Sequence, residues 1–99
     1  MDWNVVWANS SLRDLRKIEH YLLKHDPAAL PVVMKYIRVQ VRRIESNPYL
    51  SGVVSMPGAE IMRETFAASY RIIFDLNEAA QTIEILRVWH SSREEPTFD

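Results

Sequence analysis

The sequence predicts an α+β fold with the element order β-α-α-β-β-β, in which an antiparallel helical hairpin packs on one face of a small, mainly antiparallel four-stranded sheet. Two segments in the first half of the chain carry apolar residues at helical spacing and are separated only by the turn residues of "KHDP". The second half contains three short strand-like runs joined by connections of hairpin length. An aromatic and β-branched run, Trp3 to Trp7, precedes the first helical segment and favours an opening strand.

The two helices are expected over residues 8–27 and 28–48. Asn9 or Ser10 can cap the first helix, and Pro27 ends it because proline disfavours the α conformation of the preceding residue. The first helix carries its apolar residues three or four positions apart, at Leu12, Leu15, Ile18 and Leu22. The apolar stripe of the second helix is Leu30, Val33, Met34, Ile37, Val41 and Ile44. Two helices joined by so short a turn pack antiparallel.

The second half of the chain is expected to supply the sheet. Residues 49–58 contain both glycines and predict a loop, and the strand-like runs cover residues 59–65, 69–76 and 82–90. The middle run is close to continuously apolar, which predicts a central strand covered on both faces. The 99 residues contain no internal repeat and no linker-like segment, so we expect a single domain over residues 1–99.

The composition excludes several classes of function. The chain has no cysteine, which excludes disulfides, thiolate zinc sites and cysteine nucleophiles. It has neither a basic, signal-like N-terminus nor an apolar run long enough to span a bilayer, so we expect a soluble, cytoplasmic protein without membrane contact. The formal net charge of −1 provides no overall basic excess, so any nucleic-acid binding has to rest on a local cluster.

The sequence carries no recognisable metal or cofactor motif. Among His20, His25 and His90, no pair has the spacing of a helical metal site, and such histidines are more often capping or surface residues. Phosphate-binding, dinucleotide-binding and nucleophile-elbow motifs do not occur. We therefore expect neither a metal nor a cofactor.

The arginine residues of the strands are the main candidates for a functional surface. Arg63, Arg71 and Arg87 each lie within a predicted strand, and Arg93 follows the last one. One interpretation is cross-strand pairing with acids, for which the candidates are Glu60, Glu64, Asp75 and Glu84. The other is an open sheet face on which guanidinium groups converge to bind phosphate or carboxylate.

The second helix carries a further basic stripe. Lys35, Arg38 and Arg42 occupy i, i+3 and i+7 positions, away from the apolar stripe. Such a stripe is more often a solvated helix face than a ligand site, but an acidic segment of a partner could use it.

Taken in order, these segments resemble the RelE/ParE superfamily of toxins from bacterial type II toxin–antitoxin operons. The resemblance covers nearly the whole chain and rests on the opening strand leading into "SLRDLRKIEHYL", the helix ending in "IESNP", and the runs "MPGAEIMRE", "SYRIIFDL" and "IEILRVWHSSRE". It implies a compact toxin of the kind that supports plasmid stabilization, inhibits growth and is neutralised by a cognate antitoxin in a hetero-oligomeric complex. RelE-like members cleave mRNA in the ribosomal A site, whereas ParE-like members block DNA gyrase.

The resemblance also implies roles for particular residues. In a RelE-like nuclease, Arg71 of the "YR" motif supports the scissile phosphate, and Arg93 matches a basic residue placed just after the last strand. His90 matches a terminal histidine that serves as general acid and protonates the leaving oxygen. Arg63 lies where many members have a strand arginine. The residues expected to contact target or antitoxin are Arg63, Arg71, Arg87, Arg93, Lys35, Arg38 and Arg42.

The departures from the nuclease pattern favour the ParE-like group. No basic residue occurs between Tyr49 and Glu60, and no tyrosine follows Phe74, so Phe98 alone could replace the C-terminal aromatic residue. The ending "EEPTFD" is acidic, which opposes docking of RNA. "VWHSSRE" is closer to the His-x-x-Arg ending of ParE-like members. We therefore expect a toxin that inhibits gyrase by binding; the alternative is a ribosome-dependent mRNA endoribonuclease that uses Arg71, His90 and Arg93.

Overall fold

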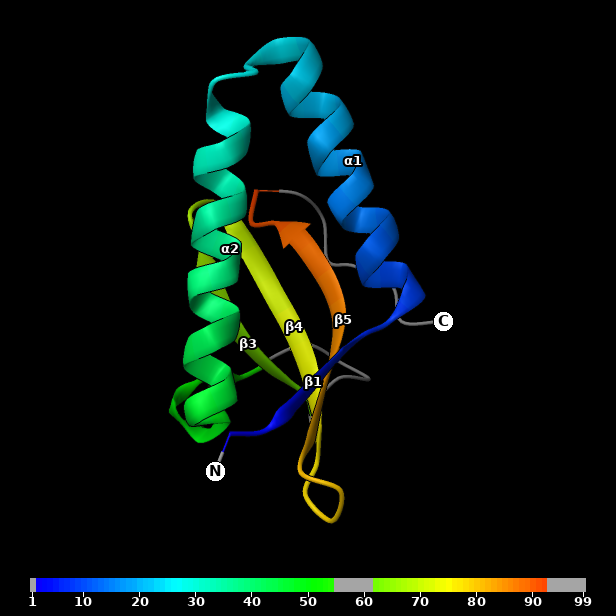
Figure 1. Cartoon of the computed structure of the whole chain (residues 1–99), viewed down its shortest axis with the longest axis vertical. Coiled ribbons are helices and arrows are strands. Elements are labelled where there is room, and N and C mark those ends of the chain that lie inside the picture. The colour runs from blue at the N-terminus through cyan, green and yellow to red at the C-terminus, as the bar shows by residue number, and fades with distance from the viewer. Residues whose placement is uncertain (1, 55–61, 93–99) are drawn as a thin grey trace.

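The structure, a computed structural model, describes residues 2–54 and 62–92 of the chain (Figure 1). Its elements follow the expected β-α-α-β-β-β order, with a short 3₁₀ helix and a short strand inserted after the second α-helix. The elements are β1 (Asn4–Trp7), α1 (Asn9–His25), α2 (Ala29–Ser46), η1 (Pro48–Leu50), β2 (Gly52–Val53), β3 (Arg63–Ala67), β4 (Tyr70–Asn77) and β5 (Thr82–His90).

The sheet formed by the described residues has five strands in the order β1-β5-β4-β3-β2, not the four that the sequence predicts. β1 runs parallel to β5, and the other neighbouring strands are antiparallel. The additional strand is β2, in which Gly52 pairs with Glu64 and Val53 with Arg63. Two residues are too few for an alternating pattern to show in a sequence, which is why the sequence predicts a loop here.

The hairpin between β3 and β4 is tighter than predicted. β3 ends at Ala67 and β4 begins at Tyr70, so only two residues connect them. Ala68 has a φ of 53°, in the left-handed region that such a short hairpin turn requires. Alanine gives no turn signal, so the predicted strand over residues 59–65 ends two residues before β3 does. The first part of the predicted strand, residues 59–61, lies outside the described residues.

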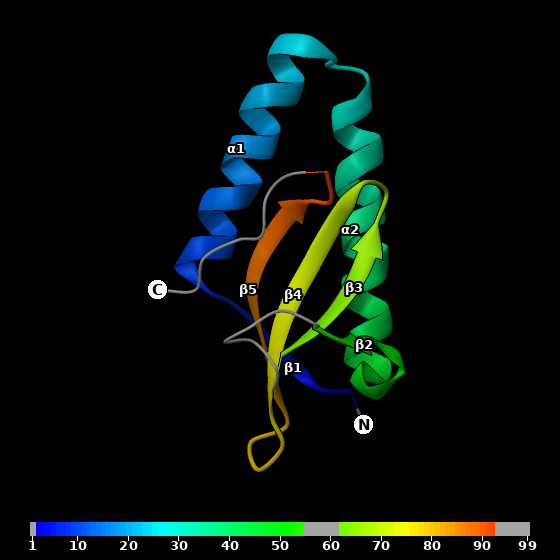
Figure 2. The ribbon, with the colours of Figure 1, turned by 180° about the vertical axis from the view of Figure 1, so that it is seen from behind.

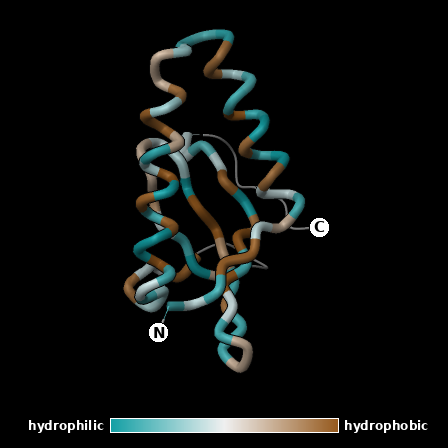
Figure 3. The backbone as a smooth tube through the Cα atoms, in the orientation of Figure 1, coloured by the Kyte–Doolittle hydropathy of each residue, from teal (hydrophilic) through white to brown (hydrophobic). Residues whose placement is uncertain are grey.

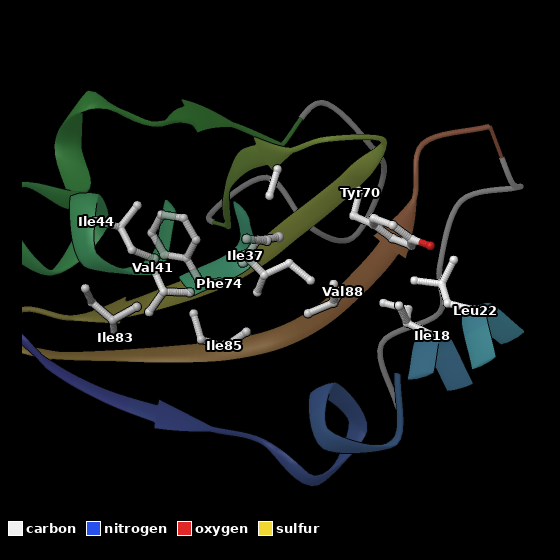
Figure 4. Packing of buried hydrophobic residues seen from close by; sticks show 12 residues of the cluster. Ile18, Leu22, Ile37, Val41, Ile44, Tyr70, Phe74, Ile83, Ile85 and Val88 are labelled. Carbon is white, nitrogen blue, oxygen red and sulfur yellow. The ribbon is translucent and has the colours of Figure 1, made fainter. Parts of the chain in front are cut away.

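The helical hairpin packs on one face of the sheet, as predicted (Figures 1 and 2). Hydrophobic positions run along the central strand, whereas hydrophobic and hydrophilic residues alternate along both helices (Figure 3). The core lies between the two layers, and side chains from α1, α2, β4 and β5 meet there (Figure 4). Among residues 2–54 and 62–92, no helix combines the length and apolarity needed to cross a bilayer.

The central strand β4 is covered on both faces, as its continuous apolar run predicts. Ile72 and Phe74 are fully buried in the core beneath the helices. Ile73 points to the opposite side of the sheet and is also fully buried, against Val54 and Met62. The sheet is therefore not an open surface over its centre.

The start of α1 differs from the expected cap. Neither Asn9 nor Ser10 caps the helix; Ala8 occupies the cap position, and no side chain bonds there. Ser11 instead donates a hydrogen bond to the Ala8 carbonyl at 2.6 Å. Leu12 is 38% exposed, and the buried line of α1 begins with two polar residues, Ser11 and Asp14. The reason lies in the contact that α1 makes with β5.

Candidate interaction site

The first turns of α1 take the place of a neighbouring strand along β5. β1 pairs only with residues Thr82–Ile85, and the Ala8 N–H bonds to the Ile85 carbonyl at 2.9 Å. Beyond that point, Ser10 Oγ donates to the Leu86 carbonyl at 2.6 Å, and the Val88 N–H donates to Asp14 Oδ2 at 3.0 Å. Two helical side chains thus satisfy backbone groups that β1 no longer reaches.

Asp14 also forms a buried ion pair with Arg87. Its two carboxylate oxygens accept from Arg87 Nε at 2.8 Å and Nη2 at 3.0 Å, and its side chain is only 4% exposed. The Arg87 guanidinium lies over the Trp89 ring, 4.7 Å from its centroid. Cross-strand pairing with an acid, one of the two interpretations of the strand arginines, does not hold for Arg87: its partner is on α1, 73 positions away in sequence. Such a separation leaves no signal in a single sequence.

Arg71 has a cross-strand partner, as one of the two interpretations of the strand arginines expects. Its Nε and Nη2 donate to Glu64 Oε2 at 3.1 and 2.7 Å, and the two side chains are 14% and 18% exposed. Arg71 lies opposite Trp89 in the β4–β5 register, and Arg87 lies opposite Ile73. Alternation along the strands therefore puts Arg71 and Arg87 on the side of the sheet away from the helices, around Trp89. Both guanidinium groups already bind carboxylates, so the open arginine face is not found here.

Arg63 does not join these two arginines. It lies opposite Phe74 in the β3–β4 register, which places it on the other side of the sheet. Its Nη1 donates to the Ser51 carbonyl at 2.9 Å, and its guanidinium is 5.2 Å from the centroid of the Tyr49 ring. Arg63 therefore ties β3 to the segment that follows α2. Arg93 lies outside the described residues.

His90 lies on the face of the sheet opposite to Arg71. It pairs with Tyr70 in the register, whereas Arg71 pairs with Trp89, so the two side chains alternate to different sides. The His90 ring packs edge-on against the buried Tyr70 ring, with centroids 5.2 Å apart. Its Nδ1 accepts the Ser92 N–H at 3.2 Å and lies 2.6 Å from Ser92 Oγ. An accepting Nδ1 leaves Nε2 as the protonated nitrogen of the neutral ring.

A cleft of about 440 Å³ lies beside His90, between α1 and the ends of β4 and β5. The volume is in the range of ordinary ligand pockets. Its walls combine apolar residues of both helices with the polar groups of the strand ends. The lining includes Lys17, Ile18, Tyr21, Leu22, Val88 and His90.

The basic residues of α2 are not among those that line this cleft. Lys35, Arg38 and Arg42 are exposed, as expected of a solvated helix face. Three exposed apolar residues lie on the same helix at i, i+4 and i+7 spacing, and these were not singled out by the sequence: Val32, Tyr36 and Val39. In the sequence, these three apolar residues could have been recognised because they lie on the helix outside the apolar stripe that packs into the core. Together these residues make α2 a basic surface with an apolar stripe.

Comparison with known proteins identifies the family. Residues 5–95 match the family model described as the ParE toxin of the type II toxin–antitoxin system parDE. A search of curated protein sequences found no significant match. The fold and the family match define a toxin of the RelE/ParE superfamily. Within it, the chain belongs to the ParE toxin family of type II toxin–antitoxin systems.

Solved structures share the fold at low sequence identity. A chain of the toxin–antitoxin complex RelBE2 from Mycobacterium tuberculosis superposes with a TM-score of 0.65 at 20% identity, covering 91% of this chain and 99% of that one. A chain of the chromosomal ParDE system of P. aeruginosa gives 0.68 at 19% identity, with 89% and 95% covered. The YoeB/ParE toxin from Agrobacterium tumefaciens gives 0.59 at 16% identity, with 88% and 96% covered.

Proposed function

We propose that this toxin inhibits growth by binding DNA gyrase, without catalysing a reaction of its own, and that a cognate antitoxin neutralises it. The support for the target is the resemblance to ParE-like members, which block gyrase, together with membership of the ParE toxin family. The observation that carries the proposal is the placement of Arg71 and His90 on opposite faces of the sheet.

A nuclease mechanism needs these two side chains at one scissile phosphate. The phosphate-binding arginine and the general acid have to reach oxygens of the same phosphorus centre, within hydrogen-bond distance of each. Arg71 and His90 are separated by the sheet itself, and Arg71 is held by Glu64 on its own side. This arrangement supports binding over cleavage.

An antitoxin partner is supported by the solved relatives and by the surface of α2. The similar structures include a RelBE2 toxin–antitoxin complex and a ParDE toxin–antitoxin system. In this chain, Val32, Tyr36 and Val39 form an exposed apolar stripe beside Lys35, Arg38 and Arg42. An amphipathic acidic segment of an antitoxin fits that combination, because apolar burial supplies affinity and the charges supply orientation.

A supercoiling assay tests the target. Purified gyrase, relaxed plasmid and ATP are incubated with increasing toxin, and we expect the supercoiled product to fall as toxin approaches and exceeds the enzyme. Adding the antitoxin encoded beside the toxin gene should restore supercoiling. Unchanged supercoiling at a large excess of folded toxin would contradict the proposal.

A survey of messenger RNA tests the alternative. After induction of the toxin, primer extension along abundant messages should show no cuts at fixed codon positions. Codon-positioned cuts that appear before any change in plasmid topology would establish the endoribonuclease instead.

A further inference from the structure

The outer face of α1 carries a continuous row of basic side chains. Five basic residues lie at i, i+3, i+4, i+7 and i+11 positions, which is the spacing of a single helix face. All five are exposed, and we call them the α1 basic stripe: Arg13, Arg16, Lys17, His20 and Lys24. Four of them are permanently charged, and they extend along about 16 Å of the helix.

The charges of this stripe are not used by contacts within the described part of the protein. Within residues 2–54 and 62–92, no ion pair or side-chain hydrogen bond engages the four arginines and lysines of the stripe. The helix contains two acids. Asp14 is buried against Arg87, and Glu19 is exposed beside the stripe. The stripe is therefore a positive surface with one carboxylate next to it.

Three acids of the described residues lie at a different end of the molecule. Asp75 and Glu84 are opposite each other on β4 and β5, and Glu78 follows in the turn between these strands. Figure 1 shows this turn at the bottom of the molecule, below both ends of α1. The formal net charge of −1 thus coexists with a local basic cluster, which nucleic-acid binding by this chain requires.

The α1 basic stripe differs from the exposed face of α2, where an apolar line runs among the charges. Leu12 and Leu23 each precede a basic residue of α1 by one position, and successive residues are about 100° apart around a helix. These two leucines therefore lie at one side of the stripe. On its other side, the Tyr21 ring packs on His25, with centroids 4.5 Å apart. The stripe itself offers charge without the apolar anchor that a protein partner needs.

We propose that the α1 basic stripe binds the phosphate backbone of double-stranded DNA, independently of base sequence. The backbone requires positive charge and no apolar anchor, because the affinity comes from the release of counterions. About 16 Å of duplex carries about ten phosphate charges, enough to face all four permanent charges of the stripe. Single-stranded nucleic acid is less suitable, because its binding relies on aromatic side chains that stack on bases, and the stripe has no Phe, Tyr or Trp.

The test is a titration of purified toxin into a fluorescently labelled DNA duplex of about 20 base pairs, followed by anisotropy at several salt concentrations. Four phosphate contacts predict a slope of about −3.6 when the logarithm of the association constant is plotted against the logarithm of the salt concentration. Binding should therefore weaken about tenfold for each doubling of the salt concentration. A duplex of unrelated sequence should bind equally well.

A matched pair of double variants locates the contact. Arg13→Gln with Lys24→Gln removes two charges of the stripe, so the slope should fall to about −1.8 and binding at about 50 mM salt should weaken about tenfold or more. Arg38→Gln with Arg42→Gln removes the same charge from α2 and should leave the slope unchanged. All four side chains are exposed, so both double variants should fold, and circular dichroism checks this.

Two other anions represent the alternative ligands of a basic helix. Single-stranded DNA of the same sequence and vesicles containing phosphatidylserine should each bind the toxin more weakly than the duplex at the same salt concentration. The proposal is overturned if the salt slope is near zero, if either of these anions binds better than the duplex, or if the two double variants behave alike. DNA binding is measured without gyrase, so its failure and the failure of the gyrase proposal are separate results.

Discussion

At the scale of single residues, Asp14 is the group on which the junction of helix and sheet most depends. It accepts from both Arg87 and the Val88 N–H while almost fully buried. The sequence does not predict this role, because an acid between two apolar helical positions, here Leu12 and Leu15, is expected to face solvent. The sequence identified the strand arginines as candidate binding residues. Whether an arginine binds a partner protein or pairs with an acid of its own chain depends on contacts between residues far apart in sequence.

We expect Asp14→Ala to lower the free energy of unfolding by about 3–5 kcal/mol, as for removal of one partner of a buried ion pair. The change leaves the Arg87 guanidinium and the Val88 amide without their acceptor. Urea denaturation measures it, and Glu64→Ala is the matched control, because the Glu64–Arg71 pair is more exposed and should cost less. Equal losses in the two variants would contradict the special role of Asp14.

A second prediction at this scale concerns His90. His90→Ala should remain toxic, with colony counts after induction within about twofold of the parent, because a binding toxin needs no proton donor. His20→Ala, at an exposed position of α1, controls for the substitution itself, and immunoblotting controls for protein level. Full recovery of growth by His90→Ala at equal protein level would count against inhibition by binding alone.

At the scale of elements, what could be predicted follows from the length of each pattern. Both helices, the hairpin that they form and the covered central strand were predictable, because the pattern of each extends over many residues. In β4 the pattern extends over the eight residues Tyr70–Asn77, with Ile72 to Phe74 buried at its centre. β2 was missed because it has two residues, and the cap of α1 was wrong because Ser10 bonds to β5 instead. The opposite placement of Arg71 and His90 requires a strand register that only the structure supplies.

The contact of α1 with β5 gives a prediction for this element pair. Ser10→Ala should lower the free energy of unfolding by about 1–3 kcal/mol, because the Leu86 carbonyl loses its donor at a partly buried position. Ser46→Ala removes a serine of the same kind from α2, where the hydroxyl bonds to its own helix at 3.4 Å and is exposed. Thermal or urea unfolding should show a smaller effect for Ser46→Ala, and the reverse order would contradict the contact.

The exposed face of α2 gives a prediction for binding. Arg38→Glu combined with Arg42→Glu should slow association with the antitoxin and reduce its dependence on salt, because charges at an exposed surface act mainly on the rate of encounter. The same double charge reversal at Arg13 and Arg16, exposed on α1, is the control. Interferometry at two salt concentrations gives both rates. Identical association rates for the two double variants would remove α2 from the antitoxin interface.

At the scale of the whole molecule, the arrangement of the charged groups supports the proposal that the toxin acts by recognition. Arg71 and Arg87 are bound within the protein, His90 lies across the sheet from Arg71, and the basic residues of α2 are exposed. A compact domain of this kind can act through shape and charge on a much larger target.

The most direct test of inhibition by binding gyrase is plasmid topology in living cells after induction of the toxin, resolved on chloroquine gels alongside total RNA. The account predicts that plasmids lose negative supercoiling while messages stay intact, in the parent and in His90→Ala alike. Normal supercoiling together with fragmented messages would contradict it.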